Sequence, residues 1–311
     1  MSTYLVTGGA GFIGSNLVRA LLDGGEQVRV LDNLATGRRE NLADLEPRLD
    51  LRLDDIRDLA ALRPAFEGVD YILHQAALPS VPRSVKDPVS TTEVNVSGTL
   101  NVLLAARDAG VKRVVIASSS SVYGANPELP KHEGMRPLPI SPYAASKLAD
   151  EAYAAAFTAV YGLETVCLRY FNVFGPRQDP KSQYAAVIPL FVNAMLRGER
   201  PTIFGDGEQS RDFTFVANVI QANVQAATAP GASGIACNIA CGERVSLNQL
   251  VGYLNDILGT DIQPEYQEER AGDVKHSLAD ISLARQALGY SPEVTFQEGL
   301  AEVVSWYRAA L

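Results

Sequence analysis

Tyr143 and Lys147 lie four residues apart in the segment 141–147, so on a helix their side chains would share one face. A positive charge within a few ångströms favours the ionised form of a phenol. Such a pair can therefore take a proton from a substrate, or return one, near neutral pH. The same spacing is common on exposed helices that do no chemistry, so the rest of the sequence has to show what surrounds the pair.

A glycine-rich turn near the N-terminus is typical of a dinucleotide site. A short apolar strand leads into residues 8–14, Gly-Gly-Ala-Gly-Phe-Ile-Gly, and a segment with helical periodicity follows. Glycines let a pyrophosphate approach the backbone at a helix N-terminus, where N–H groups are free. Asp32 ends the next strand, where a carboxylate binds the adenosine ribose and repels a 2′-phosphate. The pattern predicts NAD as the cofactor, although Arg38 and Arg39 follow closely.

Strands and helices alternate along the N-terminal part of the chain. Further strands are expected at residues 51–53, 71–77, 113–117 and 165–173, and helices at 59–66, 91–109 and 143–161. This order predicts an α/β fold with a Rossmann-type, doubly wound parallel sheet, whose ligand lies across the carboxyl ends of the strands. Ser118 to Ser121 follow the fifth strand, so their hydroxyl groups are expected in the ligand crevice.

The composition changes after Gly175, where loops rich in Pro, Gly, Gln and Asp begin. Later helices are expected at residues 213–227, 245–258, 281–288 and 296–311. We expect residues 1–174, with about 213–235, to form an NAD-binding Rossmann domain. Residues 175–212 and 236–311 would form a smaller C-terminal α/β domain that binds the substrate.

The overall composition narrows the range of partners. The chain has 27 basic and 36 acidic residues and a net charge of −9, which argues against nucleic acid or an anionic membrane. Cys167, Cys237 and Cys241 lie in apolar, strand-like runs and are expected as buried reduced thiols. Neither they nor the three histidines have metal-ligand spacing, so no metal site is expected. We find no signal peptide and no membrane-length apolar run, and we expect a cytoplasmic protein.

Along essentially the whole chain, these motifs resemble those of the extended short-chain dehydrogenase/reductase family, specifically its nucleotide-sugar 4-epimerases. The segments that carry the resemblance are residues 7–14, 31–37, 74–77, 118–124, 141–147, 169–175, 205–212 and 270–273. Together the motifs are highly specific for the family and less specific for epimerases within it.

The resemblance implies a role for each residue of the opening pair. Tyr143 would be the acid/base, and Lys147 would hold the nicotinamide ribose and favour the ionised phenol. Ser119 would bind the reacting sugar hydroxyl, with Ser120 as the alternative. The implied reaction moves hydride from C4 of the sugar to NAD⁺, turns the 4-keto sugar in the pocket, and returns hydride to the opposite face. Because no net oxidation occurs, NAD should stay bound through turnover.

The resemblance also implies contacts along both ligands. The cofactor contacts expected besides Tyr143 and Lys147 are Gly8, Gly11, Phe12, Ile13, Gly14, Asp32, Asn33, Thr36, Gly37, Asp55, Ile56, Gln75, Ala76, Ala77, Asn95, Ser118, Tyr170 and Val173. The UDP-sugar contacts expected are Ser80, Arg83, Ser119, Ser120, Tyr143, Asn172, Ala186, Val187, Ile203, Phe204, Arg211, Arg270, Asp273 and Ser277. Arg211 and Arg270 would clamp the diphosphate, which suits bidentate guanidinium groups.

Other reactions of the family fit the sequence less well. Related dehydratases carry an Asp-Glu pair directly after the catalytic Thr, and related decarboxylases carry a Glu there. Ser120 and Ser121 occupy these positions, which argues against both reactions. A non-catalytic dinucleotide-binding relative would be expected to lack Tyr143, Lys147 or the serine. A 4-keto sugar reductase would use the same tyrosine and lysine, and this alternative, like a uronate epimerase, stays open.

The sugar specificity is expected to depend on Ser277. In 4-epimerases that the chain resembles, a residue shortly after an Arg-x-Gly-Asp motif lies beside the 2-position of the sugar. A tyrosine there is associated with glucose and galactose, and a small residue with N-acetyl groups. Residues 79–85 and 183–189 also look like those of epimerases that act on UDP-N-acetylglucosamine. The family usually forms homodimers, which would pair the helices expected at 91–109 and 143–161.

Overall fold

The computed structural model describes residues 1–179, 186–269 and 275–310. Within these residues the central sheet has seven strands, all paired in parallel, in the order β11-β6-β5-β4-β1-β2-β3. The strands are β1 (Thr3–Thr7), β2 (Gln27–Leu31), β3 (Asp50–Arg52), β4 (Tyr71–His74), β5 (Arg113–Ser119), β6 (Glu164–Tyr170) and β11 (Ile235–Ile239). The expected Rossmann-type α/β fold is confirmed.

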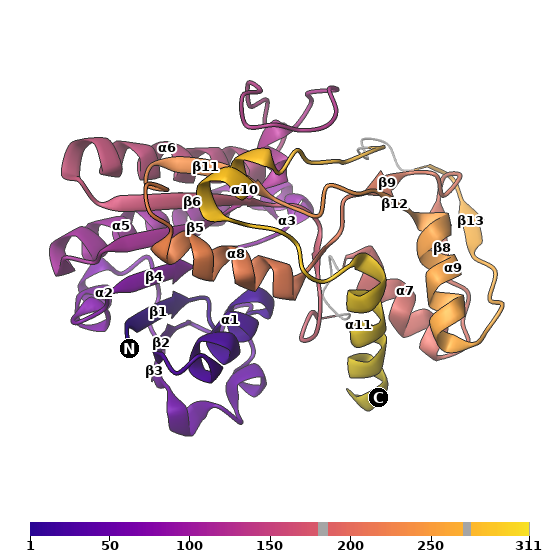
Figure 1. Cartoon of the computed structure of the whole chain (residues 1–311), viewed down its shortest axis with the longest axis horizontal. Helices are drawn as coiled ribbons and strands as arrows, with labels where there is room; N and C mark the ends of the chain where they lie inside the picture. The colour runs from indigo at the N-terminus through magenta and orange to yellow at the C-terminus, as the bar shows by residue number, and fades with distance from the viewer. Residues whose placement is uncertain (180–185, 270–274, 311) are drawn as a thin grey trace.

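Helices cover both faces of this sheet (Figure 1). One face carries α2 (Leu59–Phe66), α5 (Gly98–Ala109) and α6 (Pro142–Tyr161), and the other carries α1 (Phe12–Asp23), α8 (Val216–Thr228) and α10 (Ser282–Leu288). Alternate residues of β5 therefore face different cores: Val115 packs in the core of the second helix group, while Val114 and Ile116 pack in that of the first. Burial on both faces explains why the strand is continuously apolar.

The helix that carries Tyr143 and Lys147 has clear sequence signals at both ends. Ser141 caps α6 by accepting a hydrogen bond from the N–H of Ala144 at 3.1 Å, and Pro142 occupies the first turn. Gly162 ends the helix in the left-handed conformation, with φ of 71°. The helix predicted at 143–161 is confirmed.

The helix predicted at 91–109 is confirmed as helical throughout, but its start and its regular α-helical winding are wrong, because it begins at Pro88 and contains a π-helical turn. The chain forms α3 (Val81–Lys86), α4 (Pro88–Thr92), a π-helical turn (Glu93–Ser97) and then α5. The π-helical turn directs Asn95 inward, where its amide binds the backbone of Leu78 and the hydroxyl of Ser146. An inserted π-turn of this kind is often found at functional sites. The hydrophobic periodicity of the sequence gives no indication of this π-helical turn.

The strand predicted at 165–173 is also wrong at its end. β6 stops at Tyr170, and Asn172 has a positive φ of 35°, which asparagine tolerates better than most residues. The chain then leaves the main sheet and forms β7 (Val173–Phe174), which pairs with β10 (Thr214–Phe215). Two helices start later than predicted: α8 follows β10, and α9 (Leu247–Leu258) follows β12 (Val245–Ser246). The strand predicted at 71–77 is shorter, because β4 ends at His74.

A smaller lobe lies beside the carboxyl ends of the strands (Figure 1). Its helices α7 (Val187–Leu196), α9 and α11 (Phe296–Ala310) enclose a third apolar cluster. Two short strand pairs also belong to this lobe, namely β8 (Thr202–Phe204) with β13 (Glu265–Gln267), and β9 (Ser210–Arg211) with β12. The domain limits given above remain a prediction, and β11, which follows the segment 213–235, pairs with β6 in the main sheet.

Candidate functional site

The glycine turn between β1 and α1 leaves no room for side chains. A Cβ atom on Gly14 would lie 2.1 Å from the carbonyl oxygen of Gly8, and one on Gly8 would lie 2.7 Å from the nitrogen of Ala76. Gly11 is the N-cap of α1 and offers no side chain to cap it. The N–H groups of the first helical turn are thus left for an external anion, as a dinucleotide pyrophosphate requires. The turn fits NAD.

Asp32 lies at the end of β2, next to this turn. One carboxylate oxygen accepts a hydrogen bond from the N–H of Ala10 at 2.9 Å and the other from that of Leu34 at 2.8 Å. Burial raises the pKa of Asp32, and these two bonds partly oppose that effect. Each oxygen keeps a further acceptor position for a ribose hydroxyl. Arg38 and Arg39, which could have favoured a 2′-phosphate, instead pair with Asp179 and Glu46.

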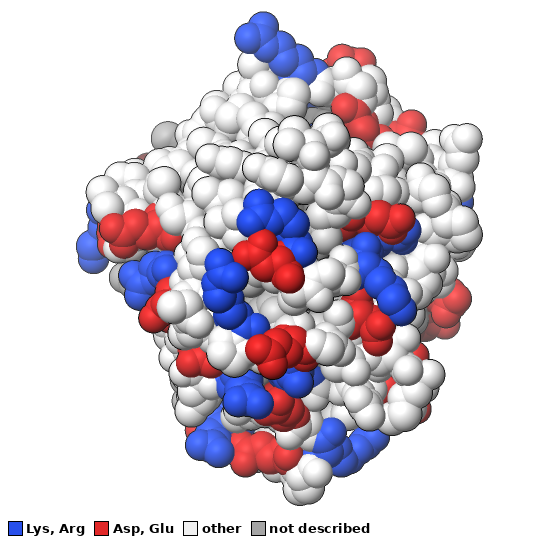
Figure 2. All heavy atoms as spheres, turned by 90° about the vertical axis from the view of Figure 1, so that its left-hand side faces the viewer, with Lys and Arg blue, Asp and Glu red and all other residues white. Residues whose placement is uncertain are grey.

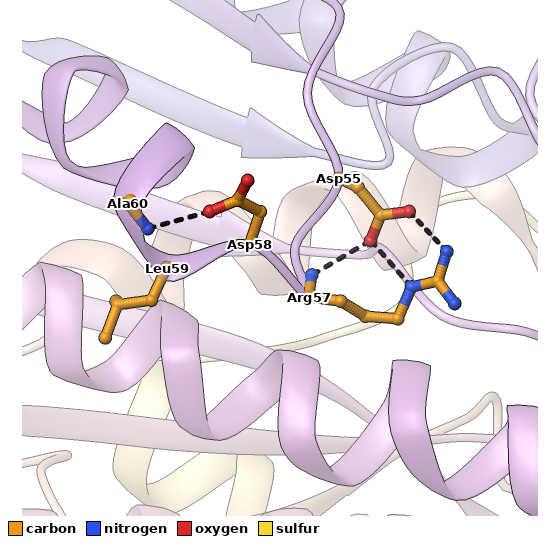
Figure 3. Close-up of a pocket in the computed structure, with 5 residues that line it drawn as sticks. All are labelled: Asp55, Arg57, Asp58, Leu59 and Ala60. Carbon is orange, nitrogen blue, oxygen red and sulfur yellow. Dashed lines mark hydrogen bonds and ion pairs between the residues drawn. The ribbon is translucent and has the colours of Figure 1, made fainter.

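Asp55, one of the expected cofactor contacts, lies at an open hollow beside the start of α2 (Figure 3). Asp55 accepts hydrogen bonds from Asn33 and from Arg57, whose guanidinium holds the pKa of Asp55 well below its usual range. Arg57, Asp58, Leu59 and Ala60 line the rest of the hollow. Ile56 is buried against Gly98. The structure thus presents an ionised acceptor, Asp55, at the rim of this hollow.

The serines lie at the carboxyl end of β5, as the sequence predicts. Ser119 is in register with Tyr170 of β6, and its Oγ accepts a hydrogen bond from the N–H of Ser121 at 3.2 Å. The hydroxyl proton of Ser119 is therefore available to a substrate oxygen. Ser118 is buried and donates a 2.5 Å hydrogen bond to Glu151 of α6. Ser120 begins the 3₁₀ turn (Ser120–Tyr123) that follows the strand.

Lys147 is buried beneath Tyr143 on the face of α6 that packs on β5 and β6. Burial alone would lower the pKa of Lys147, but Asp150 and Tyr143 outweigh it, and the net pKa of Lys147 is raised. Its ammonium group donates to Asp150 at 3.1 Å. The backbone of Tyr143 is fixed too, since its carbonyl accepts a hydrogen bond from Ser146. The pair is thus a charged lysine next to a half-buried phenol.

Two expected cofactor contacts bind each other. The amide of Gln75 donates to the hydroxyl of Tyr170 at 3.2 Å and to Asn223 of α8 at 3.1 Å, and Asn223 donates to Tyr170 at 2.8 Å. Burial raises the pKa of Tyr170 far above neutrality, so its phenol stays protonated. This cluster fixes the polar floor of the crevice. Asn223 carries no motif in the sequence and was not predicted.

A second buried network supports the serine turn. Arg169 of β6 binds both carboxylate oxygens of Glu151, at 2.9 and 2.7 Å, and donates to the hydroxyl of Tyr123 at 3.0 Å. Tyr123 in turn donates to Asn238 of β11 at 2.7 Å. Glu151 belongs to no motif that assigns it a role. A charged residue inside a predicted buried strand needs a partner, and Arg169 is the signal that could have led to it.

On the substrate side, three distant segments meet at Asn172. Its amide donates to the carbonyl of Asp212 at 2.9 Å and to the hydroxyl of Ser277 at 3.1 Å. Ser277 also accepts a hydrogen bond from the N–H of Asp212. Arg211 donates to the carbonyls of Ser210 and Lys275. The structure therefore brings together Asn172, an expected UDP-sugar contact, and Ser277, the expected specificity residue.

The other expected substrate contacts are more scattered. Ser80 is the N-cap of α3 and binds the N–H of Arg83. Ala186 and Val187 begin α7, and Ile203 is buried in the apolar cluster of the smaller lobe. Arg270 and Asp273 lie outside the described residues. The remaining expected contacts with some solvent exposure are Phe12, Ile13, Asn33, Thr36, Gly37, Ala76, Ala77, Val173 and Phe204.

No metal centre is formed by the part of the chain that the structure describes: it holds no group of three or more His, Cys, Asp or Glu suited to a metal ion. All three cysteines are free thiols, with Cys167 and Cys237 buried and Cys241 partly exposed. The described helices include none that is long and apolar enough to cross a membrane.

A parallel sheet with a glycine turn, an acid at the end of β2 and a Tyr-Lys pair at its carboxyl edge is the arrangement of a dinucleotide-dependent enzyme. Residues 4–240 match the model of the NAD-dependent epimerase/dehydratase family, and the chain belongs to this family. Its cofactor is NAD, which solved relatives contain.

The most informative relatives cover nearly the whole chain. A UDP-glucose 4-epimerase from Mycolicibacterium smegmatis is 42% identical over 309 residues, which are 98% of each chain. The structure is similar to that of a UDP-N-acetylglucosamine 4-epimerase from Methanobrevibacter ruminantium M1 in complex with UDP-N-acetylmuramic acid, with a TM-score of 0.95, 44% identity and 100% and 99% coverage. It is also similar to a Thermus thermophilus UDP-glucose 4-epimerase in complex with NAD, with a TM-score of 0.88, 38% identity and 99% and 100% coverage.

Proposed function

We propose that this protein is an NAD-dependent 4-epimerase of UDP-hexoses that interconverts UDP-glucose with UDP-galactose and UDP-N-acetylglucosamine with UDP-N-acetylgalactosamine. The observation that carries the proposal is the position of Tyr143 and the charged Lys147 on α6, packed over the strand that ends at Ser119. Relatives named for both sugar pairs, and solved with UDP-glucose or with a UDP-linked N-acetyl sugar, support it.

In this proposal each residue has one task. Tyr143 accepts the proton of the sugar 4-hydroxyl and later returns it, while Lys147 keeps a positive charge beside the phenol. Ser119 donates its free hydroxyl proton to the same sugar oxygen, because its Oγ already accepts from the backbone of Ser121. The glycine turn and Asp32 would hold NAD, which would supply the hydride acceptor and donor for C4 of the sugar. Since neither Ser120 nor Ser121 is an acid, the chain supplies no carboxylate there for elimination.

The purified protein, without added cofactor, tests this directly. Incubation with each of the four UDP-sugars, followed by NMR, should show the 4-epimer of each one. A requirement for added NADH, with net consumption of a 4-keto sugar, would identify a reductase instead. Turnover of the plain pair without the acetylated pair would disprove the wider substrate range.

We assign the wider substrate range to Ser277. A tyrosine at this position would fill the space beside the sugar and remove the hydrogen bonds to Asn172 and Asp212. Ser277→Tyr should therefore lose acetylated turnover by about 10-fold to 100-fold more than plain turnover, the range that steric rejection gives. Ser277→Ala is the matched control, since it loses the same hydrogen bonds without added bulk and should keep both activities in proportion. Equal losses on both pairs in Ser277→Tyr would contradict the assignment.

We also propose that the protein is a cytoplasmic homodimer. The outer face of α6 exposes Tyr153, Val160 and Tyr161, an apolar surface suited to a second copy. Sedimentation of the full chain should give twice the mass of the chain. A Val160→Glu variant should shift the equilibrium toward the monomer, and a protein that is monomeric at micromolar concentration would refute the proposal.

A further inference from the structure

Lys147 forms a buried ion pair with Asp150, an acid that belongs to none of the sequence motifs. Its Nζ donates to Oδ2 of Asp150 at 3.1 Å, and the two side chains are only 4% and 0% exposed. The residues are three apart on α6 and share its inner face. Removing an ammonium group from water costs free energy unless an anion lies next to it. Asp150 therefore decides whether Lys147 stays charged.

The other titratable groups around this pair do not offer that compensation. Glu151 is bound to Arg169 and Ser118. The thiol of Cys167, on β6, is neutral because burial raises its pKa well above the ordinary value. His74, on β4, is neutral because burial lowers its pKa to about 3. Tyr143 is the reacting group itself.

Asp150 is in turn connected to the strand that carries the glycine turn. Thr7, the last residue of β1, is 2.6 Å from Nδ1 of His74, and Nε2 of His74 is 3.0 Å from the hydroxyl of Thr99. Burial raises the pKa of Asp150 to about 6, while Lys147 and the nearby hydroxyl of Thr99 favour its ionised form. The second carboxylate oxygen, Oδ1, has no hydrogen-bond partner among the described residues. A neutral histidine that accepts from Thr7 and donates to Thr99 leaves the Thr99 proton for that oxygen.

We propose that Asp150 is a positioning residue of the reaction, which fixes the ammonium group of Lys147 and keeps it charged. Through Thr99, His74 and Thr7 it ties this ammonium group to the start of the cofactor turn at Gly8. The proposal rests on the catalytic role of Lys147 given above. Asp150 itself touches neither the sugar nor the cofactor.

The proposal predicts a change in pH dependence when the charge of Asp150 is removed. Burial is the largest influence on Lys147 and lowers its pKa, while the charge of Asp150 raises it. Without Asp150 the ammonium group would therefore lose its proton at a lower pH. The alkaline limb of kcat/KM should move down by about one pH unit or more.

The test is Asp150→Asn, which keeps the shape of the side chain, in the enzyme with its bound NAD. We would measure kcat/KM for UDP-galactose from pH 6 to 10, together with NAD content and KM at each pH. The control is Asp70→Asn, which removes the acid of an exposed Lys-Asp pair with an N···O distance of 2.8 Å. We expect the limb to shift in Asp150→Asn, with KM within about two-fold, and to stay in place in Asp70→Asn.

An unchanged limb in Asp150→Asn, or a loss of kcat that is uniform across the pH range, would overturn the positioning role. Asp150→Thr gives the same comparison if Asp150→Asn melts below the assay temperature. Lys147→Met separates this proposal from the one on which it rests. An active Lys147→Met enzyme would refute the role of Lys147, whereas an inactive one with an unshifted Asp150→Asn would refute only the role of Asp150.

Discussion

The two ends of the central sheet treat charged residues in opposite ways. At the end where the strands begin, basic and acidic side chains alternate on the surface (Figure 2). Lys112 and Asp70 form such a pair there, with side chains 62% and 30% exposed. At the end where the strands finish, Lys147 pairs with Asp150 and Arg169 with Glu151, and none of these four side chains is more than 8% exposed.

The difference shows at which end of the sheet the ion pairs are buried. At the first end, water reaches at least one partner of each of these pairs, including Glu164 of the Arg113–Glu164 pair, in which Arg113 itself is only 7% exposed. The buried pairs at the second end lose their hydration, and each depends on its partner. In a parallel sheet this second end is also where the glycine turn, the serine turn and the start of α6 converge. The ion pairs in which both side chains are buried thus lie at the crevice in which the chemistry is proposed.

The largest effect is expected from the reacting group at the crevice end. Tyr143→Phe removes the proposed acid/base and should lower kcat by about 10²-fold to 10⁴-fold, the usual contribution of general acid–base catalysis. NAD should stay bound, because the glycine turn and Asp32 are unchanged. Steady-state rates and the NAD content of the purified variant measure both quantities. Turnover close to that of the unmodified enzyme would refute the assignment.

The next effect is on stability. Glu151→Gln leaves Arg169 buried with only neutral partners, among them the hydroxyl of Tyr123, and the free energy of unfolding should fall by about 3–5 kcal/mol. Glu164→Gln is the comparison at the other end, since Glu164 is 49% exposed and its partner Arg113, only 7% exposed, also donates to the carbonyls of Ala226 and Ala229. It should cost less than Glu151→Gln, because these carbonyls and water at Glu164 still satisfy Arg113. Urea unfolding of both variants gives the comparison, and equal losses would remove the distinction between the two ends.

A smaller and pH-dependent effect is expected at His74. Its pKa is lowered to about 3 by burial in the folded protein, and the unfolded chain has the ordinary value of 6.5. Between pH 6.5 and 3 the unfolded state therefore binds a proton that the folded state does not, so stability falls as the pH falls. The slope from this residue approaches about 1.4 kcal/mol per pH unit.

The variant His74→Gln should flatten the pH dependence of the unfolding free energy between pH 6 and 4. His132→Gln, at a position whose side chain is 44% exposed, is the control and should leave the slope as it is. Unfolding midpoints measured at several pH values decide between these outcomes. A slope that His74→Gln leaves intact would show that His74 is not the group that titrates.

The sequence predicted those parts of the structure that depend on local patterns. The glycine turn, the acid after β2 and the start of α6 follow from spacing and capping, and the structure has all three. The parts that depend on which faces meet could not be predicted. In the sequence, Asp150 is one of 36 acidic residues and nothing distinguishes it. Only the packing of α6 on β5 and β6 shows that it is buried beside Lys147.

The two departures from the predicted elements have a common physical origin. Residues 91–109 and 165–173 have the composition of a continuous helix and a continuous strand. In the folded chain a tertiary requirement interrupts each of them. The π-helical turn brings Asn95 to Ser146, and the positive φ at Asn172 brings its amide to Ser277. Both interruptions serve the crevice, which is where local and global preferences are expected to conflict.

The smallest effect is expected at the end where the strands begin. Asp70→Asn removes the partner of Lys112, but the amide oxygen can still accept the hydrogen bond that the N–H of Thr3 gives to Asp70 at 2.9 Å. Because water screens this pair, the melting temperature should change by at most about 2 °C, and less at high salt. Thermal unfolding at two ionic strengths measures both. A large loss that salt does not reduce would show that desolvated charge also holds this end of the sheet together, and the contrast between the ends would no longer stand.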